Sequence, residues 1–163
     1  MVLSGAELIG SLQNEVRILL HLAGKIDPEW LDYRPTPKQR SIIELLRYLS
    51  YMGPELIKAA KAGNFDPEVW TAAEQAGNAR DLEQTLQTIS GQTGEYASLL
   101  SEMSDGQYRE EIEMFGQRMS RGAFLINMVL AGCAAYRMQL FLYLKSCGRE
   151  ELGTMNLWAG VDG

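Results

Sequence analysis

Residues 33–49 of this chain read YRPTPKQRSIIELLRYL, and within them an extended segment changes into a helix. Pro35 and Pro37 cannot continue a preceding helix, and they hold the residues before them in an extended conformation. Ser41 and Glu44 then match a capping box, in which each side chain satisfies a free backbone donor at the start of a helix. The segment therefore predicts a helix that begins at position 41.

Apolar residues at alternating three- and four-residue steps continue this helix and indicate three further helices along the chain. We expect helices over approximately residues 6–24, 41–62, 78–103 and 120–147, joined by long connections. No segment sustains the period-two alternation of a half-buried strand, so a sheet of any size is not expected. A chain of 163 residues has the usual length of one domain. The predicted fold is all-α, a four-helix bundle that spans residues 1–163 as a single domain.

Two features weaken this pattern. Pro54 lies inside the second predicted helix and is expected to kink it. Gly91 and Gly94 lie inside the third, where they indicate either a close helix contact or a helix in two pieces. Residues 104–119 are polar and acidic, and they are expected to be irregular or to form a short extended pair. The tail, residues 148–163, is expected to fold back over the helices.

Composition argues against several classes of partner. The net charge of -6 and the pI near 4.9 argue against nucleic-acid binding. The longest uncharged run, residues 122–136, is shorter than the roughly 20 residues of a membrane-spanning helix, so we expect a buried helix and no membrane partner. Cys133 and Cys147 would lie roughly 21 Å apart on one helix, too far for a disulfide. Two reduced cysteines are typical of a cytoplasmic protein.

Two segments resemble the DinB-like proteins. In that family, a stretch of prolines and then a serine leads into a second helix that reads roughly Ser-Ile-x-Glu-Leu-Leu-x-His-Leu, as residues 33–49 do here. The family's fourth helix commonly reads His-x-x-x-His-Arg-Gly-Gln-Leu, then apolar residues, Tyr-Leu-Arg and a glycine, and residues 132–148, GCAAYRMQLFLYLKSCG, are similar. The residues in register are Arg137, Gln139, Leu140, Tyr143, Leu144, Lys145 and Gly148. The resemblance covers about a fifth of the chain and implies the DinB-like fold.

The family's functional signature is a set of three metal-binding histidines, one on the second helix and two on the fourth. The matching positions here are Tyr48, Gly132 and Tyr136. Positions 132 and 136 still share a helix face, but glycine offers no ligand and a phenol, with a pKa of about 10, rarely ionises to bind a divalent ion. The single histidine, His21, falls on the first helix. We therefore expect neither a bound metal nor a cofactor.

Two arrangements of the former metal site are open. In the first, the rings of Tyr48 and Tyr136 fill the space, with their hydroxyls bonded to each other or to water. In the second, the site is a cavity for a small, anionic organic ligand, floored by glycine and ringed by aromatic and polar groups. The residues of this candidate site are Tyr48, Gly132, Tyr136, Arg47, Arg137 and Gln139. Arg47 and Arg137 are also compatible with solvated helix faces.

Three functions remain open. The first is a metal-free descendant of the DinB-like fold that binds a small molecule or another protein. The alternative that the resemblance implies is an enzyme of the thiol-transferring or isomerising type with an altered site, working through Tyr48, Tyr136 or Arg137. The third is a structural homodimer, for which the apolar fourth helix supplies a face, and it is compatible with either of the others. No other catalytic constellation is present in the sequence, so it assigns no reaction.

Overall fold

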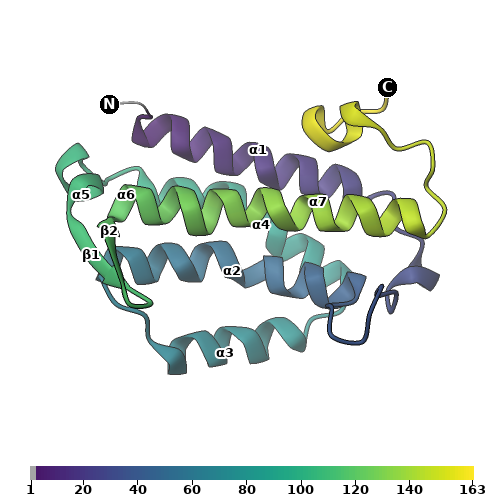
Figure 1. Cartoon of the computed structure of the whole chain (residues 1–163), viewed down its shortest axis with the longest axis horizontal. Helices are drawn as coiled ribbons and strands as arrows, with labels where there is room; N and C mark the ends of the chain where they lie inside the picture. Colours follow the sequence, from purple (N-terminus) through teal and green to yellow (C-terminus); the bar gives the residue numbers. More distant parts are fainter. Residues whose placement is uncertain (1–2) are drawn as a thin grey trace.

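Four long helices run side by side along the molecule (Figure 1). A computed structural model describes residues 3–163 of the chain. The first three long helices are α1 (Gly5–Ala23), α2 (Ile42–Ala62) and α4 (Leu82–Leu100). The fourth is continuous through α6 (Arg121–Phe124), a π-helical segment (Leu125–Leu130) and α7 (Ala131–Ser146). The predicted all-α class is confirmed.

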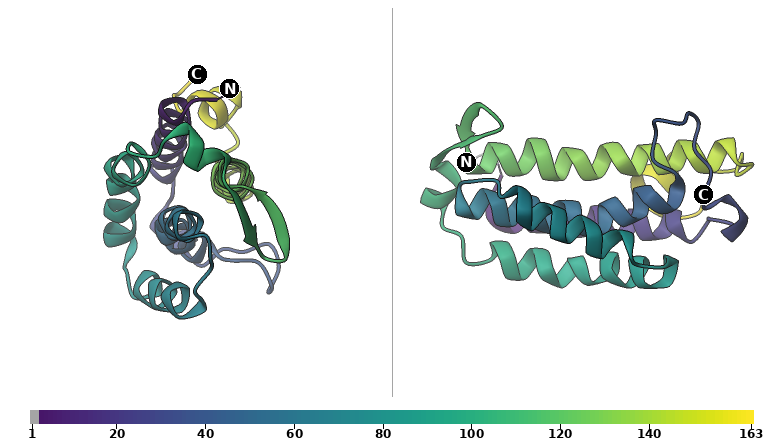
Figure 2. Two further views of the ribbon diagram at one scale, coloured as in Figure 1. Left: turned by 90° about the vertical axis from the view of Figure 1, so that its left-hand side faces the viewer. Right: turned by 90° about the horizontal axis from the view of Figure 1, so that it is seen from below.

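The core lies between these helices. Seen along the helix axes, α4 and α7 each pack against both α1 and α2, so α1 and α2 lie diagonally opposite each other (Figure 2, left). Leu12, Leu45, Ile89 and Leu140 come one from each long helix, and all four are fully buried. Burying each such side chain stabilises the fold by roughly 1.5 to 3 kcal/mol relative to its exposed state. The apolar stripes of the sequence are therefore the contacts that join the helices.

A long connection without a helix was expected after α2, but the segment between α2 and α4 contains a further helix. This helix, α3 (Pro67–Asn78), packs on the outer side of α2 (Figures 1 and 2). The Asp66 side chain accepts the backbone N–H groups of Glu68 and Val69, and Pro67 occupies the first helical position, where its missing N–H is not needed. Only Gly77 of this helix is buried, so its sequence carries no strong apolar stripe.

The third predicted helix is a single piece that begins at Leu82 rather than at position 78. Asp81 caps it and forms a capping box with Gln84. A Cβ on Gly91 or Gly94 would meet no atom within 4 Å, so these glycines mark neither a break nor a close contact. In the second helix, Ser41 and Glu44 form the predicted capping box, and α2 continues through Pro54.

Residues between α4 and α6 form one turn of helix and a short hairpin. The helix is α5 (Asp105–Arg109), and the antiparallel strands are β1 (Glu111–Met114) and β2 (Gln117–Ser120), with Glu111 opposite Ser120. Phe115 and Gly116 make the tight turn with φ angles of 53° and 75°, as a twisted two-residue hairpin requires. The extended pair considered from the sequence is present, and the tail folds back so that its π-helical residues 155–159 lie against α1.

The expectation that residues 122–136 form a buried helix is wrong. The helical segment Arg121–Ser146 is long and apolar enough to cross a membrane, as some core helices of soluble proteins also are. Only 28% of its most apolar 18-residue stretch is buried within the protein. Its inner side packs on α1 and α2, whereas an apolar row faces outward. We call this row the α7 stripe, and it consists of Met128, Ala131, Ala135, Met138 and Leu142.

Candidate functional site

Tyr48 of α2 and Tyr136 of α7 meet where the resemblance places two of the family's histidines. Their ring centroids are 5.2 Å apart and the rings stand at 74°, an edge-to-face contact. Both side chains are half-buried. Burial raises the pKa of the Tyr48 phenol well above its ordinary value, and the neighbouring Tyr136 adds to the effect. The Tyr48 phenol therefore stays neutral at neutral pH and packs against the Tyr136 ring.

The space beside Gly132 is occupied by the side chain of Met52. A Cβ added to Gly132 would lie 3.5 Å from the terminal methyl of Met52 and 3.6 Å from its sulfur, both ordinary contact distances. Met52 lies one turn after Tyr48 on α2 and is 2% exposed. Because this side chain packs over the glycine, Gly132 does not floor an open cavity.

The residues at the three positions that the resemblance matches to metal ligands do not fit a three-histidine centre. They offer two neutral phenols and a glycine, none of which supplies an imidazole nitrogen. Within residues 3–163, no group of three or more histidine, cysteine, aspartate or glutamate side chains is arranged to hold a metal ion. His21 lies on α1, where its Nε2 atom is 3.1 Å from the Asn156 amide nitrogen. It is therefore part of the contact between α1 and the tail.

Arg137 lies on a different face of α7 from Tyr136. Its guanidinium is buried, and it donates to the Glu15 carboxylate at 2.7 and 3.1 Å and to the Leu157 carbonyl oxygen. Successive helical residues point about 100° apart, so the residue after Tyr136 faces α1 and the tail. Arg137 was expected either to line the same space as Tyr48 or to lie on a solvated helix face. It does neither, because it is buried against Glu15 and the tail.

Gln139 is connected to Tyr48 only indirectly, through hydrogen bonds to other residues. Its side-chain amide donates to the Tyr143 hydroxyl at 2.6 Å, and that hydroxyl donates to the backbone carbonyl of Arg40 at 2.9 Å. The chain of bonds fixes the loop that leads into α2. Arg40 itself stacks on Tyr48, with its guanidinium carbon 3.8 Å from the ring centroid and 5.9 Å from that of Tyr136. Sequence reasoning missed Arg40, because a loop residue belongs to no periodic pattern.

A cavity of about 290 Å³ lies on the outer side of Tyr48, between α2 and α3. We call it the tyrosine pocket, and its lining residues are Arg40, Glu44, Arg47, Tyr48, Tyr51, Glu74 and Asn78. Positions 44, 47, 48 and 51 share one face of α2, and positions 74 and 78 share one face of α3. Of the predicted site residues, only Arg47 and Tyr48 line it. Glu74 and Asn78 were missed because α3 was not predicted.

Interactions with neighbouring residues hold the walls of the tyrosine pocket. Arg47 Nε donates to the Arg80 carbonyl at 2.8 Å. The Glu44 carboxylate accepts from Arg34 at 2.8 Å and from the Ser41 backbone N–H at 2.9 Å, and the Ser41 bond, with Arg34 second, lowers its pKa. Burial raises the pKa of Tyr51, and the nearby Glu74 carboxylate raises it further. Both the neutral phenol and the ionised Glu44 are therefore stable features of this pocket.

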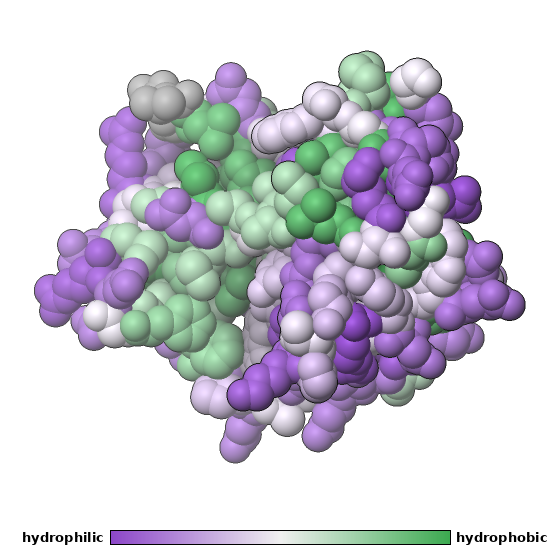
Figure 3. Space-filling view, turned by 45° about the vertical axis from the view of Figure 1, so that its right-hand side comes forward, coloured by the Kyte–Doolittle hydropathy of each residue, from purple (hydrophilic) through white to green (hydrophobic). Residues whose placement is uncertain are grey.

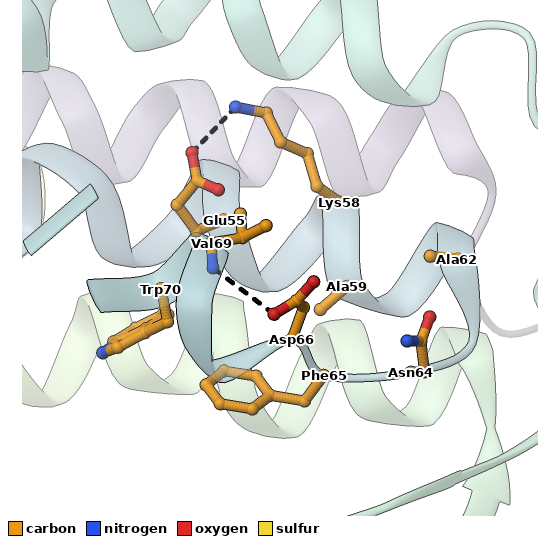
Figure 4. Close-up of a pocket in the computed structure, with 9 residues that line it drawn as sticks. All are labelled: Glu55, Lys58, Ala59, Ala62, Asn64, Phe65, Asp66, Val69 and Trp70. Atoms are coloured by element: carbon orange, nitrogen blue, oxygen red, sulfur yellow. Dashed lines mark hydrogen bonds and ion pairs between the residues drawn. The ribbon is translucent and has the colours of Figure 1, made fainter. Parts of the chain in front are cut away.

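A second cavity, of about 260 Å³, lies at the other end of the α2–α3 contact (Figure 4). Figure 4 shows Lys58 and Glu55 joined by an ion pair, which spans 2.8 Å, and Asp66 bonded to the backbone of Val69. Phe65 and Trp70 form its apolar side, with ring centroids 5.5 Å apart. Its charged side chains already pair with one another or with backbone N–H groups at the start of α3. Fewer charged groups are therefore left to contact a ligand here than in the tyrosine pocket.

The chain is similar to a known protein in its structure but not in its sequence. No family model matches the sequence, and no curated protein matches it. The crystal structure of a DinB-like protein, YjoA from Bacillus subtilis, is similar to this chain with a TM-score of 0.68. The likeness covers 90% of this chain and 94% of that one, at 18% sequence identity. The chain therefore has the fold of a DinB-like protein.

Proposed function

We propose that this chain is a metal-free member of the DinB-like family that acts by binding rather than by metal-dependent catalysis. The proposal rests on the residues found at the three positions that match the family's histidines. Tyr48 and Tyr136 pack against each other, and Met52 covers Gly132. The inner space of the former site is thus filled by side chains that do not ligate divalent ions at neutral pH. Measuring bound metal in the untagged protein tests the proposal.

The small-ligand form of this function belongs in the tyrosine pocket. Its aromatic wall, two arginines and volume of about 290 Å³ fit a small organic molecule. The alternative, a thiol-transferring or isomerising enzyme with an altered site, would have to activate a thiolate without a metal. Cys133 does not serve, because burial raises the pKa of its thiol to about 12. Thiol-transfer activity that survives chelation and is lost in Tyr48→Phe would support the enzyme.

The protein-interaction form is a homodimer built on the α7 stripe. Met128, Met138 and Leu142 are 40%, 41% and 53% exposed, and apolar atoms gather in a band across this face of the molecule (Figure 3). Ala131 and Ala135 lie between them and allow two helices to approach closely. Such a row packs on its own copy across a twofold axis, because the same patch serves both subunits. A second copy of the chain is the occupant we propose.

Leu142→Glu tests the homodimer, because a carboxylate within the paired stripes would be desolvated without a partner. Light scattering after gel filtration should give twice the chain mass for the wild type and the chain mass for the variant. Glu113→Gln, on the exposed strand β1, is the control and should leave the dimer intact. A wild-type protein that is monomeric across the micromolar range would exclude this form, and binding to lipid vesicles would assign the stripe to a membrane instead.

A further inference from the structure

The tyrosine pocket carries charges of both signs that are not neutralised within the protein. Within residues 3–163, no carboxylate lies within 4.0 Å of a nitrogen of Arg40 or Arg47, and no Lys, Arg or His nitrogen lies within that distance of Glu74. Glu44 is the exception, because Arg34 pairs with it from outside the pocket. From these opposed charges we propose that the pocket binds a small amino-acid zwitterion with a second carboxylate. This inference rests on the small-ligand form of the proposed function.

The two arginines form the side of the pocket that would hold carboxylates. Arg40 stacks the face of its guanidinium on the Tyr48 ring, at 3.8 Å. Stacking occupies the face of the group and leaves the in-plane N–H donors free, and these are the donors that grip a carboxylate in a bidentate pair. Arg47 is held by its Nε bond to Arg80, so its two terminal nitrogens remain for a second carboxylate. Both groups are therefore oriented before a ligand arrives.

Glu74 forms the opposite side of the pocket, on α3. The close approach of α3 to α2 places it there, because a Cβ on Gly77 would lie only 2.7 Å from the Tyr51 ring. Glu74 and Arg40 both act on the Tyr51 phenol, whose pKa the carboxylate raises and the guanidinium lowers. The two charges therefore flank Tyr51, yet they do not pair with each other. A ligand ammonium beside Glu74 would complete the arrangement.

The balance of charge selects the class of ligand. Two guanidinium groups and one carboxylate lack a partner, so the complementary molecule has two carboxylates and one ammonium group. Size agrees with this, since about 290 Å³ is at the small end of ligand pockets. An acidic amino acid has both properties. A dicarboxylate without the ammonium would leave Glu74 facing negative charge, and an ω-amino acid with one carboxylate would leave one arginine without a partner.

Calorimetric titration with L-glutamate, glutarate and 4-aminobutyrate tests the inference, because each of the latter two lacks one charged group of the first. L-Glutamate should bind at least about tenfold more tightly than either, since one charge-assisted hydrogen bond is worth that much. Arg40→Gln should weaken L-glutamate by about tenfold. Glu74→Gln should abolish the preference for L-glutamate over glutarate. Lys38→Gln in the same loop and Glu68→Gln on the same helix are matched controls that should bind as the wild type does.

Three results would overturn the inference. The first is glutarate binding as tightly as L-glutamate to the wild type, which would leave a small-ligand pocket but not one for a zwitterion. The second is L-glutamate binding that neither Arg40→Gln nor Glu74→Gln changes, which would place the ligand elsewhere. The third is no heat of binding at millimolar L-glutamate. The proposed metal-free function fails by a different measurement, the metal content of the protein, in which no amino acid takes part.

Discussion

The edge of one tyrosine ring rests on the face of the other where Tyr48 and Tyr136 meet, with 5.2 Å between the ring centroids. The contact joins α2 to α7 at positions where the resemblance to DinB-like proteins implies metal ligands. Arg40 covers the outer side of Tyr48, and Met52 fills the inner side beside Gly132. A packed aromatic contact thus stands in the place where the resemblance implies a metal centre.

The strength of this contact can be measured with a double-mutant cycle. Tyr48→Ala and Tyr136→Ala should each lower the free energy of unfolding by about 2 kcal/mol, because each removes a half-buried ring. The double variant should lose about 1 kcal/mol less than the sum, since the edge-to-face interaction is lost only once. Urea unfolding followed by circular dichroism gives all four values. Additivity within about 0.3 kcal/mol would show that the two rings do not interact.

The raised pKa of Tyr48 predicts late ionisation of its phenol. The contribution of the Tyr48 phenol to the free energy of unfolding is complete below its ordinary pKa of about 10. It is lost as the pH rises above that value, because the unfolded state then gains more from ionisation of the phenol than the folded state does. In an ultraviolet absorbance titration, Tyr48→Phe should remove one of the late-ionising phenols among the seven tyrosines. The urea-unfolded protein, in which every phenol ionises near its ordinary pKa, is the reference. If the variant loses an early phenol instead, Tyr48 is not buried as described.

The buried ion pair of Glu15 and Arg137 should contribute to stability more than an exposed pair does. The side chains of Glu15 and Arg137 are 13% and 5% exposed, whereas those of Glu113 and Arg118 are 62% and 72% exposed. Glu15→Gln should cost about 3 kcal/mol of unfolding free energy, because it leaves a buried guanidinium without its counter-charge. Glu113→Gln should change it by less than about 0.5 kcal/mol. Equal losses in the two variants would contradict the burial of Arg137.

Restoring the family's ligands tests the register of the resemblance. The triple variant Tyr48→His, Gly132→His, Tyr136→His should bind one equivalent of Zn²⁺, because three imidazoles that share one space are a sufficient ligand set. The backbone at position 132 accepts a Cβ at ordinary contact distance from Met52, whose flexible side chain can move. The variant with only Tyr48→His and Tyr136→His is the control and should bind more weakly. A triple variant with no affinity for zinc would mean that the three positions do not converge.

The sequence predicted the helices that carry continuous apolar stripes, because those stripes are the core contacts themselves. It missed α3, since a helix with a single buried residue, Gly77, leaves only its start signal at Asp66 and Pro67. It also predicted residues 122–136 to be buried, although it offered the apolar fourth helix as a face for a homodimer. The uncharged run of residues 122–136 indicates an apolar helix, but composition does not specify which side of that helix lacks a neighbour within the chain.

The sequence pointed to Tyr48 and Tyr136, whose rings are in contact, but most of the lining of the tyrosine pocket could not be predicted. Arg137 was misplaced because the direction of its side chain depends on the rotation of α7 against α1, and only the 100° step from Tyr136 indicates it. Arg40 and Glu74 come from a loop and from α3. They reach the tyrosine pocket through tertiary contacts that no local pattern encodes, namely the Tyr143 hydroxyl bond for Arg40 and the close approach at Gly77 for Glu74.

The metal content of the protein tests the central claim most directly. The chain would be purified without a histidine tag, incubated with zinc, nickel, manganese or iron(II), passed through gel filtration and measured by elemental mass spectrometry. With two neutral phenols and a glycine at the ligand positions, we predict well below one equivalent of each metal. One equivalent of any of them that survives gel filtration would contradict the claim and would require a metal site made of other residues.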